Sequence, residues 1–329
     1  MLSNKYFRIQ IIHLSISVIA LLNASCSGEH QETLVDEKIA ECTSSANKDF
    51  GTMNRALLAT HFESLDELQE IVDINYLKDS NLTDEHQKVS IRHCSRGVEI
   101  NSVLASGKDE GDFKEANNGN FWNKLEIVIE APYAVQNRAS IQQIFLLARR
   151  KPDIFGQGDI AFYDLALACV NHIAAEDLIK FSEKDTTEKG FINTFNHITA
   201  QALVTSLFSE KTADFIADAH ELHNMPELVT GKFKREQLTD PENNPIDNYV
   251  DIINNEWGQE LGKTLSIKYK LDSQTRWTAS LMANYLNDMQ EYYSWSFNIR
   301  MRPFRESDEI VYRFAEKFNL VLHDDKPSS

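Results

Sequence analysis

Three things are scarce in this sequence: basic charge, the motifs of the common enzyme classes, and alternating apolar and polar residues. The 33 basic residues face 50 acidic ones, and the net charge of −17 argues against binding to nucleic acid and against adsorption of the folded body to anionic headgroups. There is no Gly-rich phosphate loop, no Gly-x-Ser-x-Gly elbow and no His-Glu-x-x-His zinc motif. These absences leave no ready-made assignment to an enzyme class.

Apolar residues at helical spacing are abundant instead, and they continue with few interruptions from residue 34 onwards. Hydrophobic residues make up 42% of the 329, enough for a large core. We therefore predict an all-α fold, a multi-helix bundle. In detail, the spacing predicts single helices over residues 83–105 and 159–181, and a polar loop over residues 107–119.

The N-terminus has the features of a secretion signal. Lys5 and Arg8 precede an apolar stretch over residues 9–22, and Asn-Ala-Ser then leads to Cys26. This resembles a bacterial lipoprotein signal, in which cleavage precedes a cysteine that becomes lipidated. The resemblance implies a protein held by acyl chains in the cell envelope, on the outer membrane facing the periplasm, for which Ser27 is suitable. The alternative is ordinary secretion with Cys26 unmodified.

The chain divides by composition into five stretches. We expect a signal peptide over 1–25, a tether over 26–40, an N-terminal helical region over 41–187, a central helical unit over 188–270 and C-terminal helices over 271–329 that complete the same body. An oxidising compartment would favour a disulfide between Cys42 and Cys94, because both lie in the N-terminal third. Cys169 lies in an apolar run and is predicted to be buried.

The central unit carries an unusual polar face. At about 100° per residue, the stretch from residue 247 to 262 places six Asp, Asn and Gly residues on one face. These residue types disfavour helices, so something other than helix propensity selects them. The two glycines, one turn apart, would let another backbone approach closely. The six are Asp247, Asp251, Asn254, Asn255, Gly258 and Gly262.

Two preceding segments add further polar residues in a recognisable order. Asn193-x-Phe-x-His197 is followed by Ala-His220-Glu221 and then by Asp-x-x-Asn-Asn-x-x-Gly at residues 251–258. This order resembles an uncharacterised bacterial helical domain, over residues 188–265, that occurs in secreted and surface proteins of bacteria and their phages. Ile253 stands where that family has a histidine. The resemblance implies a helical unit but no activity.

These side chains permit two interpretations. The first is a binding or structural module of the envelope, in which the cluster is a satisfied hydrogen-bond network and His197 donates to Asp251. The alternative is a metal-dependent hydrolase with a zinc-like divalent ion, His197, His220 and Asp251 as ligands and Glu221 as general base. Adjacent helical residues point about 100° apart, which weighs against His220 and Glu221 sharing one target. The sequence names no substrate, protein partner or oligomeric state.

Near the C-terminus, residues 292–297 (Tyr-Tyr-Ser-Trp-Ser-Phe) concentrate aromatic side chains. Their helical spacing predicts core packing, with a glycan-binding platform as the alternative. The basic stretch over residues 300–305 is expected to pair with acidic surface, and an anionic ligand is the sharper alternative.

Overall fold

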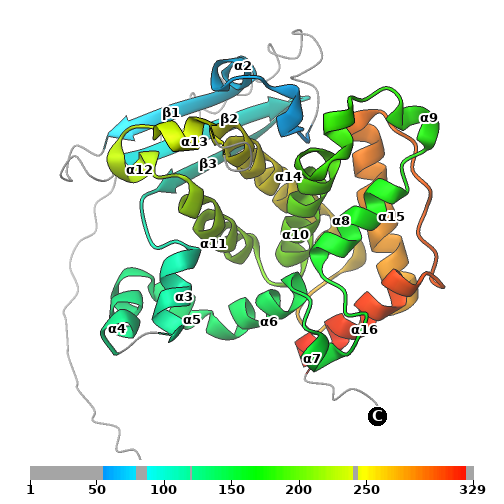
Figure 1. Ribbon diagram of the computed structural model, residues 1–329. Helices are drawn as coiled ribbons and strands as arrows, with labels where there is room; N and C mark the ends of the chain where they lie inside the picture. Colours follow the sequence, from blue (N-terminus) through cyan, green and yellow to red (C-terminus); the bar gives the residue numbers. More distant parts are fainter. Residues whose placement is uncertain (1–54, 79–86, 119–120, 240–243, 324–329) are drawn as a thin grey trace, which may run out of the picture. The chain divides into compact units, whose positions relative to one another are not determined.

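The computed structural model describes residues 55–78, 87–118, 121–239 and 244–323, which all belong to one unit, Glu41–Ser329. This described part is mostly helical, but it also contains a three-stranded antiparallel sheet in the order β1-β2-β3 (Figure 1). The strands are β1 (Val72–Lys78), β2 (Gln87–Ser95) and β3 (Val98–Ala105). The prediction of a purely helical fold is therefore wrong in this region, and the fold is mostly α.

The hairpin of β2 and β3 lies within residues 83–105, where the apolar spacing predicts one helix. Alternate residues along both strands are buried, but His93 and Ser102 occupy two of these inward positions and weaken the apolar pattern. The strands are joined by Arg96 and Gly97, whose φ angles of 49° and 77° fit a tight two-residue hairpin turn. A two-residue turn between alternating runs is the signal that could have identified the hairpin.

The sheet packs against α14 (Pro245–Tyr269), the longest helix of the described part. The apolar side chains of the sheet form a core with the face of α14 that carries Tyr249, Ile253 and Trp257. Trp257 is fully buried, and its Nε1 donates a hydrogen bond to Nδ1 of His93, 2.9 Å away. His93, whose polarity interrupts the apolar pattern of β2, is thus the hydrogen-bond partner of the Trp257 indole.

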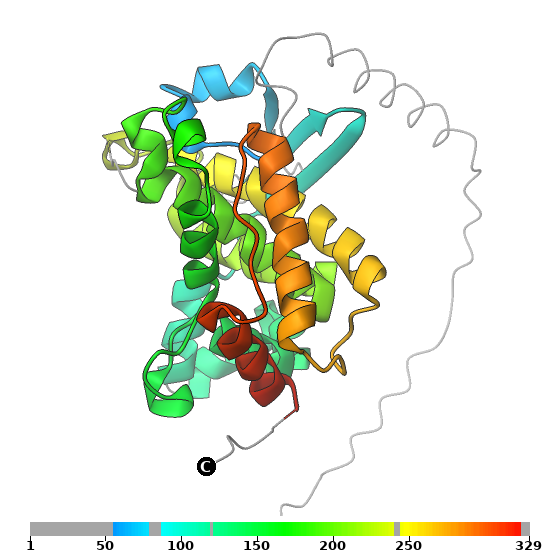
Figure 2. The ribbon, with the colours of Figure 1, turned by 90° about the vertical axis from the view of Figure 1, so that its right-hand side faces the viewer.

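The opposite face of α14 packs against α10 (Asn193–Leu207). A Cβ atom added at Gly258 would lie 2.9 Å from the carbonyl oxygen of Ile198, and one at Gly262 would lie 2.5 Å from that of Ala202. The close backbone approach predicted for the two glycines is confirmed. Beside α10 runs α15 (Ala279–Phe297), orange in Figures 1 and 2, with the Tyr293 ring stacked on Phe195 at 3.9 Å between centroids.

The remaining helices correct two further expectations. The predicted loop over residues 107–119 contains α3, and the helix predicted over 159–181 is divided into α8 and α9, because the chain at Ile173 pairs with Met301. The α-helices not yet given are α2 (Leu65–Gln69), α3 (Glu110–Asn118), α4 (Phe121–Glu130), α5 (Pro132–Gln136), α6 (Arg138–Ala148), α7 (Pro152–Phe155), α8 (Phe162–Asn171), α9 (Ala175–Leu178), α11 (Glu210–Glu221), α12 (Glu227–Thr230), α13 (Arg235–Thr239) and α16 (Glu309–His323).

The cysteine and membrane predictions fall partly outside the described residues. Cys169 is free and buried, as predicted. Cys94 is disulfide-bonded, whereas Cys42 lies outside the described residues, so the pairing of these two stays a prediction. The signal peptide, the tether and Cys26 also lie outside them. Within the described ranges, no helix has both the length and the hydropathy to cross a bilayer.

The contact of α14 with α10 predicts the effect of one methyl group. Helix propensity alone would favour alanine over glycine inside α14 by about 1 kcal/mol. A Cβ at residue 258 would meet backbone atoms of α10 within 3.0 Å, so we expect Gly258→Ala to destabilise the protein by about 1–3 kcal/mol instead. Urea denaturation followed by circular dichroism measures the change.

Gly107→Ala is the matched control, because a Cβ there comes no nearer than 3.7 Å to the carbonyl oxygen of Ala105. Equal stability of the two variants would show that the helices separate at little cost.

Candidate functional site

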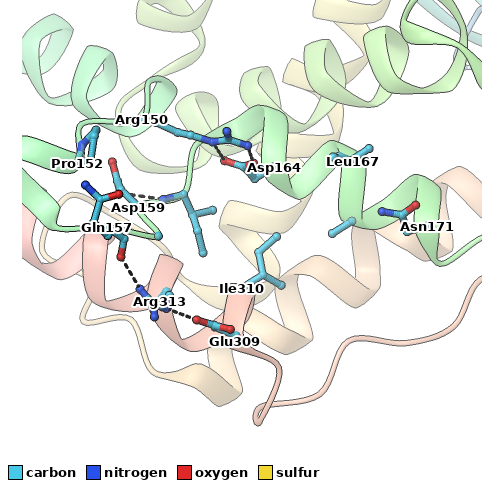
Figure 3. A pocket seen from close by; sticks show the side chains of 13 residues that line it. Arg150, Pro152, Gln157, Asp159, Asp164, Leu167, Asn171, Glu309, Ile310 and Arg313 are labelled. Carbon is cyan, nitrogen blue, oxygen red and sulfur yellow. Dashed lines mark hydrogen bonds and ion pairs between the residues drawn. The ribbon is translucent and has the colours of Figure 1, made fainter.

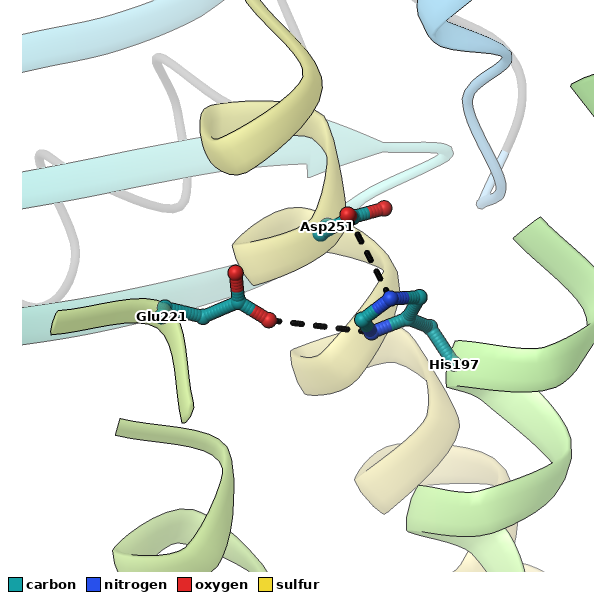
Figure 4. Close-up of side chains that lie close together, drawn as sticks. All are labelled: His197, Glu221 and Asp251. Atoms are coloured by element: carbon teal, nitrogen blue, oxygen red, sulfur yellow. Dashed lines mark ion pairs between the residues drawn. The ribbon is translucent and has the colours of Figure 1, made fainter. Parts of the chain in front are cut away.

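Three helices bring a histidine and two carboxyl groups together. His197 comes from α10, Glu221 is the last residue of α11, and Asp251 lies in the second turn of α14 (Figure 4). His197 Nε2 is 3.3 Å from Asp251 Oδ2, and His197 Nδ1 is 3.7 Å from Glu221 Oε1. One ligand atom from each residue lies within 4.8 Å of the others, so the three could hold a metal ion. We call this group the candidate metal centre.

Asn255 fixes the orientation of the histidine. Its Nδ2 donates to Glu221 Oε1 at 3.0 Å, and its Oδ1 lies 2.9 Å from His197 Nδ1. An amide oxygen can only accept, so in this arrangement His197 Nδ1 carries the proton. Nε2 is then left with a lone pair that faces Asp251. Asn255 thus prepares the nitrogen nearest the aspartate to act as a ligand or a hydrogen-bond acceptor.

A second hydrogen-bonded pair supports the aspartate. Asn193 Nδ2 donates to Asp251 Oδ1 at 2.8 Å and lies 3.5 Å from Asp247 Oδ1. Asp247, in the first turn of α14, also pairs with Lys189 Nζ at 2.5 Å. Lys189 therefore pairs directly with the outer carboxylate, whereas the nearest partners of Asp251 are amide and imidazole groups.

Burial controls the charges in this group. It lowers the pKa of His197 to about 4 and raises the pKa of Glu221 to about 7. Burial also raises the pKa of Asp251 well above its ordinary value, and the charges of Asp247 and Glu221 raise it further. At neutral pH the imidazole is thus uncharged, and the raised pKa of Asp251 favours the protonated form of that carboxyl. The carboxylic O–H of Asp251 can then donate to the lone pair of His197 Nε2.

His220 points away from the candidate metal centre. Its Nδ1 lies 2.9 Å from Glu110 Oε2 on α3, its side chain is 53% exposed, and its ring centroid is 6.3 Å from that of His197. This hydrogen bond raises the pKa of His220 and lowers that of Glu110. The group that converges therefore contains Glu221 rather than its neighbour, as the 100° step between adjacent helical residues requires.

Asn254, predicted to join the polar cluster, instead holds another part of the chain. Its Oδ1 accepts a hydrogen bond from Leu57 N and its Nδ2 donates to Leu57 O, both at 2.9 Å. Thr194 on α10 also donates to Leu57 O, at 2.8 Å. Asn254 therefore acts as a peptide-like partner for the backbone at residue 57, a role that no sequence motif indicated.

Sequence reasoning also missed neighbouring ionisable groups. Lys189 lies one turn before Asn193, but a turn of π-helix at Glu188–Ile192 breaks the simple spacing. Asp218, one turn before Glu221, and Glu256, next to Asn255, are largely buried acids. Burial and neighbouring carboxylates raise the pKa of Asp218 to about 8 and that of Glu256 to about 7. The surroundings of the candidate metal centre are therefore richer in buried acid than the motif suggested.

A separate cavity of about 580 Å³ lies between α8 and α16 and shares no residue with this centre (Figure 3). Two guanidinium groups line it, but each meets a carboxylate of its own. Arg150 Nε donates to Asp164 Oδ2 at 2.9 Å, and Arg313 Nε lies 2.7 Å from Glu309 Oε1. The cavity therefore presents neutralised pairs and adds nothing to the candidate metal centre.

Comparison with known proteins gives no independent assignment. The scan against protein-family models found no match, and the searches of curated proteins and of solved structures found none either. The resemblance to a bacterial helical domain stays a prediction, and the geometry of the site carries the functional argument.

The raised pKa of Glu221 predicts a pH-dependent effect of its amide variant. The carboxyl has a pKa of about 7 when folded and 4.5 ordinarily, so the folded state keeps a proton that the unfolded chain releases. Stability is thus lost as pH rises from about 4.5 to 7. In the metal-free protein, Glu221→Gln should add on the order of 3 kcal/mol at pH 8 and little at pH 4.5.

Urea denaturation in the presence of a chelator at the two pH values measures the difference. Glu316→Gln, at an exposed glutamate, is the control. If the stability of both variants depends on pH in the same way, the pKa of Glu221 is not raised in the folded protein.

Proposed function

We propose that this chain is a bacterial envelope lipoprotein whose central helical unit, residues 188–270, is a divalent-metal-binding module. The observation that supports the module is the convergence of His197, Glu221 and Asp251 within 4.8 Å. The N-terminus, with basic residues, then an apolar stretch and then Cys26, supports a location in the cell envelope.

The donor set suits a borderline divalent ion. One imidazole and two carboxylates are ligands that Zn²⁺ and Mn²⁺ accept, and three protein ligands leave a position for water. The histidine already has the protonation that coordination through Nε2 requires, because Asn255 accepts from Nδ1. Asp251 lies on the Nε2 side of the ring, whereas Glu221 lies nearer Nδ1 and would have to turn toward Nε2 to complete the ligand set. Such an outer partner, which fixes the tautomer of a ligating histidine, is typical of metal sites.

The burial of two carboxyl groups supports the same proposal. Glu221 and Asp251 are 2% and 6% exposed, and their raised pKa values show that ionisation in this site is costly. A divalent ion between His197 Nε2 and Asp251 would replace the proton shared there and neutralise the carboxylate. Metal binding would therefore release protons and strengthen as pH rises.

Metal analysis of the purified protein tests the proposal. After incubation with Zn²⁺ at pH 8 and desalting, we expect about one ion per chain, and loss of that ion in His197→Ala and in Asp251→Asn, because each removes a ligand. Circular dichroism establishes that the variants are folded. His223→Ala is the control, since that histidine is exposed and contacts Asp109 instead.

Absence of metal from the wild-type protein, together with variants that melt at lower temperature, would contradict the proposal. The cluster would then be a structural hydrogen-bond network.

A metal-dependent hydrolase is the second candidate, and the pKa of Glu221 favours it. A carboxyl that titrates near pH 7 is suited to accept a proton from metal-bound water. In this version Glu221 is the general base, and His197, His220 and Asp251 are the ligands. His220 would have to leave Glu110 and turn inward.

Hydrolysis of chromogenic esters and phosphoesters by the Zn²⁺-loaded protein tests this candidate. Glu221→Gln should lower kcat about 100-fold or more while metal content is retained, because the base is lost and the ligands remain. Loss of the metal in Glu221→Gln would instead make Glu221 a ligand. If the Zn²⁺-loaded wild-type protein hydrolyses none of these substrates, the hydrolase candidate is wrong and the metal-binding module stands.

A further inference from the structure

Two arginines meet at one partly exposed tryptophan, away from the candidate metal centre. The guanidinium carbon of Arg55 is 5.2 Å from the ring centroid of Trp257 and 5.5 Å from that of Trp295. The guanidinium carbon of Arg96 is 4.7 Å from the Trp295 centroid. Trp257 is fully buried, whereas Trp295 is 36% exposed. We call these four residues the arginine–tryptophan cluster.

Among the described residues, no carboxylate forms an ion pair with the arginines of this cluster. Several other arginines of the described residues pair with carboxylates, as Arg150 does with Asp164 and Arg300 with Asp177. Within the described ranges, neither Arg55 nor Arg96 forms an ion pair, and Arg55 Nε is buried without a hydrogen-bond partner. Two positive charges are therefore gathered on one aromatic ring of a protein whose net charge is −17.

The backbone at Arg96 is strained in a way that favours this placement. Its φ of 49° lies in the left-handed region, which costs a residue with a side chain about 1 kcal/mol and is usually filled by Asn or Gly in such turns. An arginine at this position does not stabilise the turn. Strain that persists at an exposed position points to a function for the side chain, here a cation held beside Trp295.

Arg55 is held in place by its neighbours on two helices. The hydroxyl of Tyr292 on α15 donates a hydrogen bond to the backbone carbonyl of Arg55. Two residues further on, Asn254 of α14 makes both of its hydrogen bonds with the backbone of Leu57. The backbone that carries Arg55 is therefore fixed, and its guanidinium already lies beside two tryptophan rings, which lowers the entropic cost of binding.

We propose that the arginine–tryptophan cluster binds the phosphate group of a phosphomonoester. A guanidinium stacked on an aromatic face keeps its N–H groups at the edge, where they can donate in pairs to an oxyanion. Two monocations match the dianionic charge of a phosphomonoester better than that of a single carboxylate. The exposed part of Trp295 offers apolar surface for the organic portion. A soluble phosphomonoester and a lipid headgroup share this chemistry.

Calorimetric titration of the purified protein with sn-glycerol 3-phosphate tests the site. Arg96→Asn should weaken binding about tenfold, since a hydrogen-bonded charge is lost. The same variant should melt at a higher temperature without ligand, because asparagine suits the left-handed turn. Binding and stability thus move in opposite directions, which a simple loss of folding would not produce. Arg55→Gln should also weaken binding, and Arg305→Gln, at an exposed arginine elsewhere, should not.

The source of the phosphate is decided by vesicles of phosphatidylcholine with and without phosphatidic acid. They are mixed with the chain carrying Cys26→Ala, which cannot be acylated. Binding that requires both phosphatidic acid and Arg96 assigns a lipid phosphate, and binding of glycerol phosphate alone assigns a soluble ligand. If the wild-type protein binds neither probe, or if Arg96→Asn binds as the wild type does, the proposal is wrong. The exposed turn position of Arg96 keeps this test valid even if Arg55→Gln fails to fold.

Discussion

The close approach of α10 and α14 is the constraint on which the rest of the described structure depends. Because Gly258 and Gly262 have no side chains, the two helix backbones come close enough for short polar side chains to meet about two turns before Gly258 on α14. His197 and Asp251 meet across this contact, although they are 54 residues apart in the chain. A wider separation would require longer side chains, and the hydrogen bonds of Asn193 with Asp251 and of His197 with Asn255 would be lost.

That approach also has an electrostatic consequence. It removes three carboxyl groups and an imidazole from water and provides amides, rather than charges, as most of their partners. The folded protein therefore holds protons that its unfolded chain would release near neutral pH. A site in this condition exchanges protons for a cation readily, which links its hydrogen-bond network to its proposed metal binding.

The sequence predicted the parts of the fold that depend on local periodicity. The helix with Asp, Asn and Gly on one face is present, and its glycines make the contact inferred from their spacing. The hairpin was missed, because His93 and Ser102 stand at buried positions where the strand pattern calls for apolar residues. Their presence depends on tertiary partners, such as the indole of Trp257 on a helix more than 160 residues away, and local patterns do not record these.

The candidate site, like the fold, could be predicted only in part from the sequence. The residue types and their order identified the segments that converge, but adjacency in sequence could not decide whether His220 or Glu221 faces inward. The helix ends at Glu221, so the last side chain turns toward α14 while the preceding one turns toward α3. The aromatic stretch near residue 295 is likewise mixed, with Tyr293 buried in the core and Trp295 partly exposed beside two arginines.

The two hydrogen bonds of Asn254 with Leu57 have a mechanical consequence for the proposed anchor. They fasten the chain at residue 57 to α14, the helix that carries Asp251. Under the lipoprotein proposal, a pull on the N-terminus would be resisted at this contact as well as at the disulfide of Cys94 on β2.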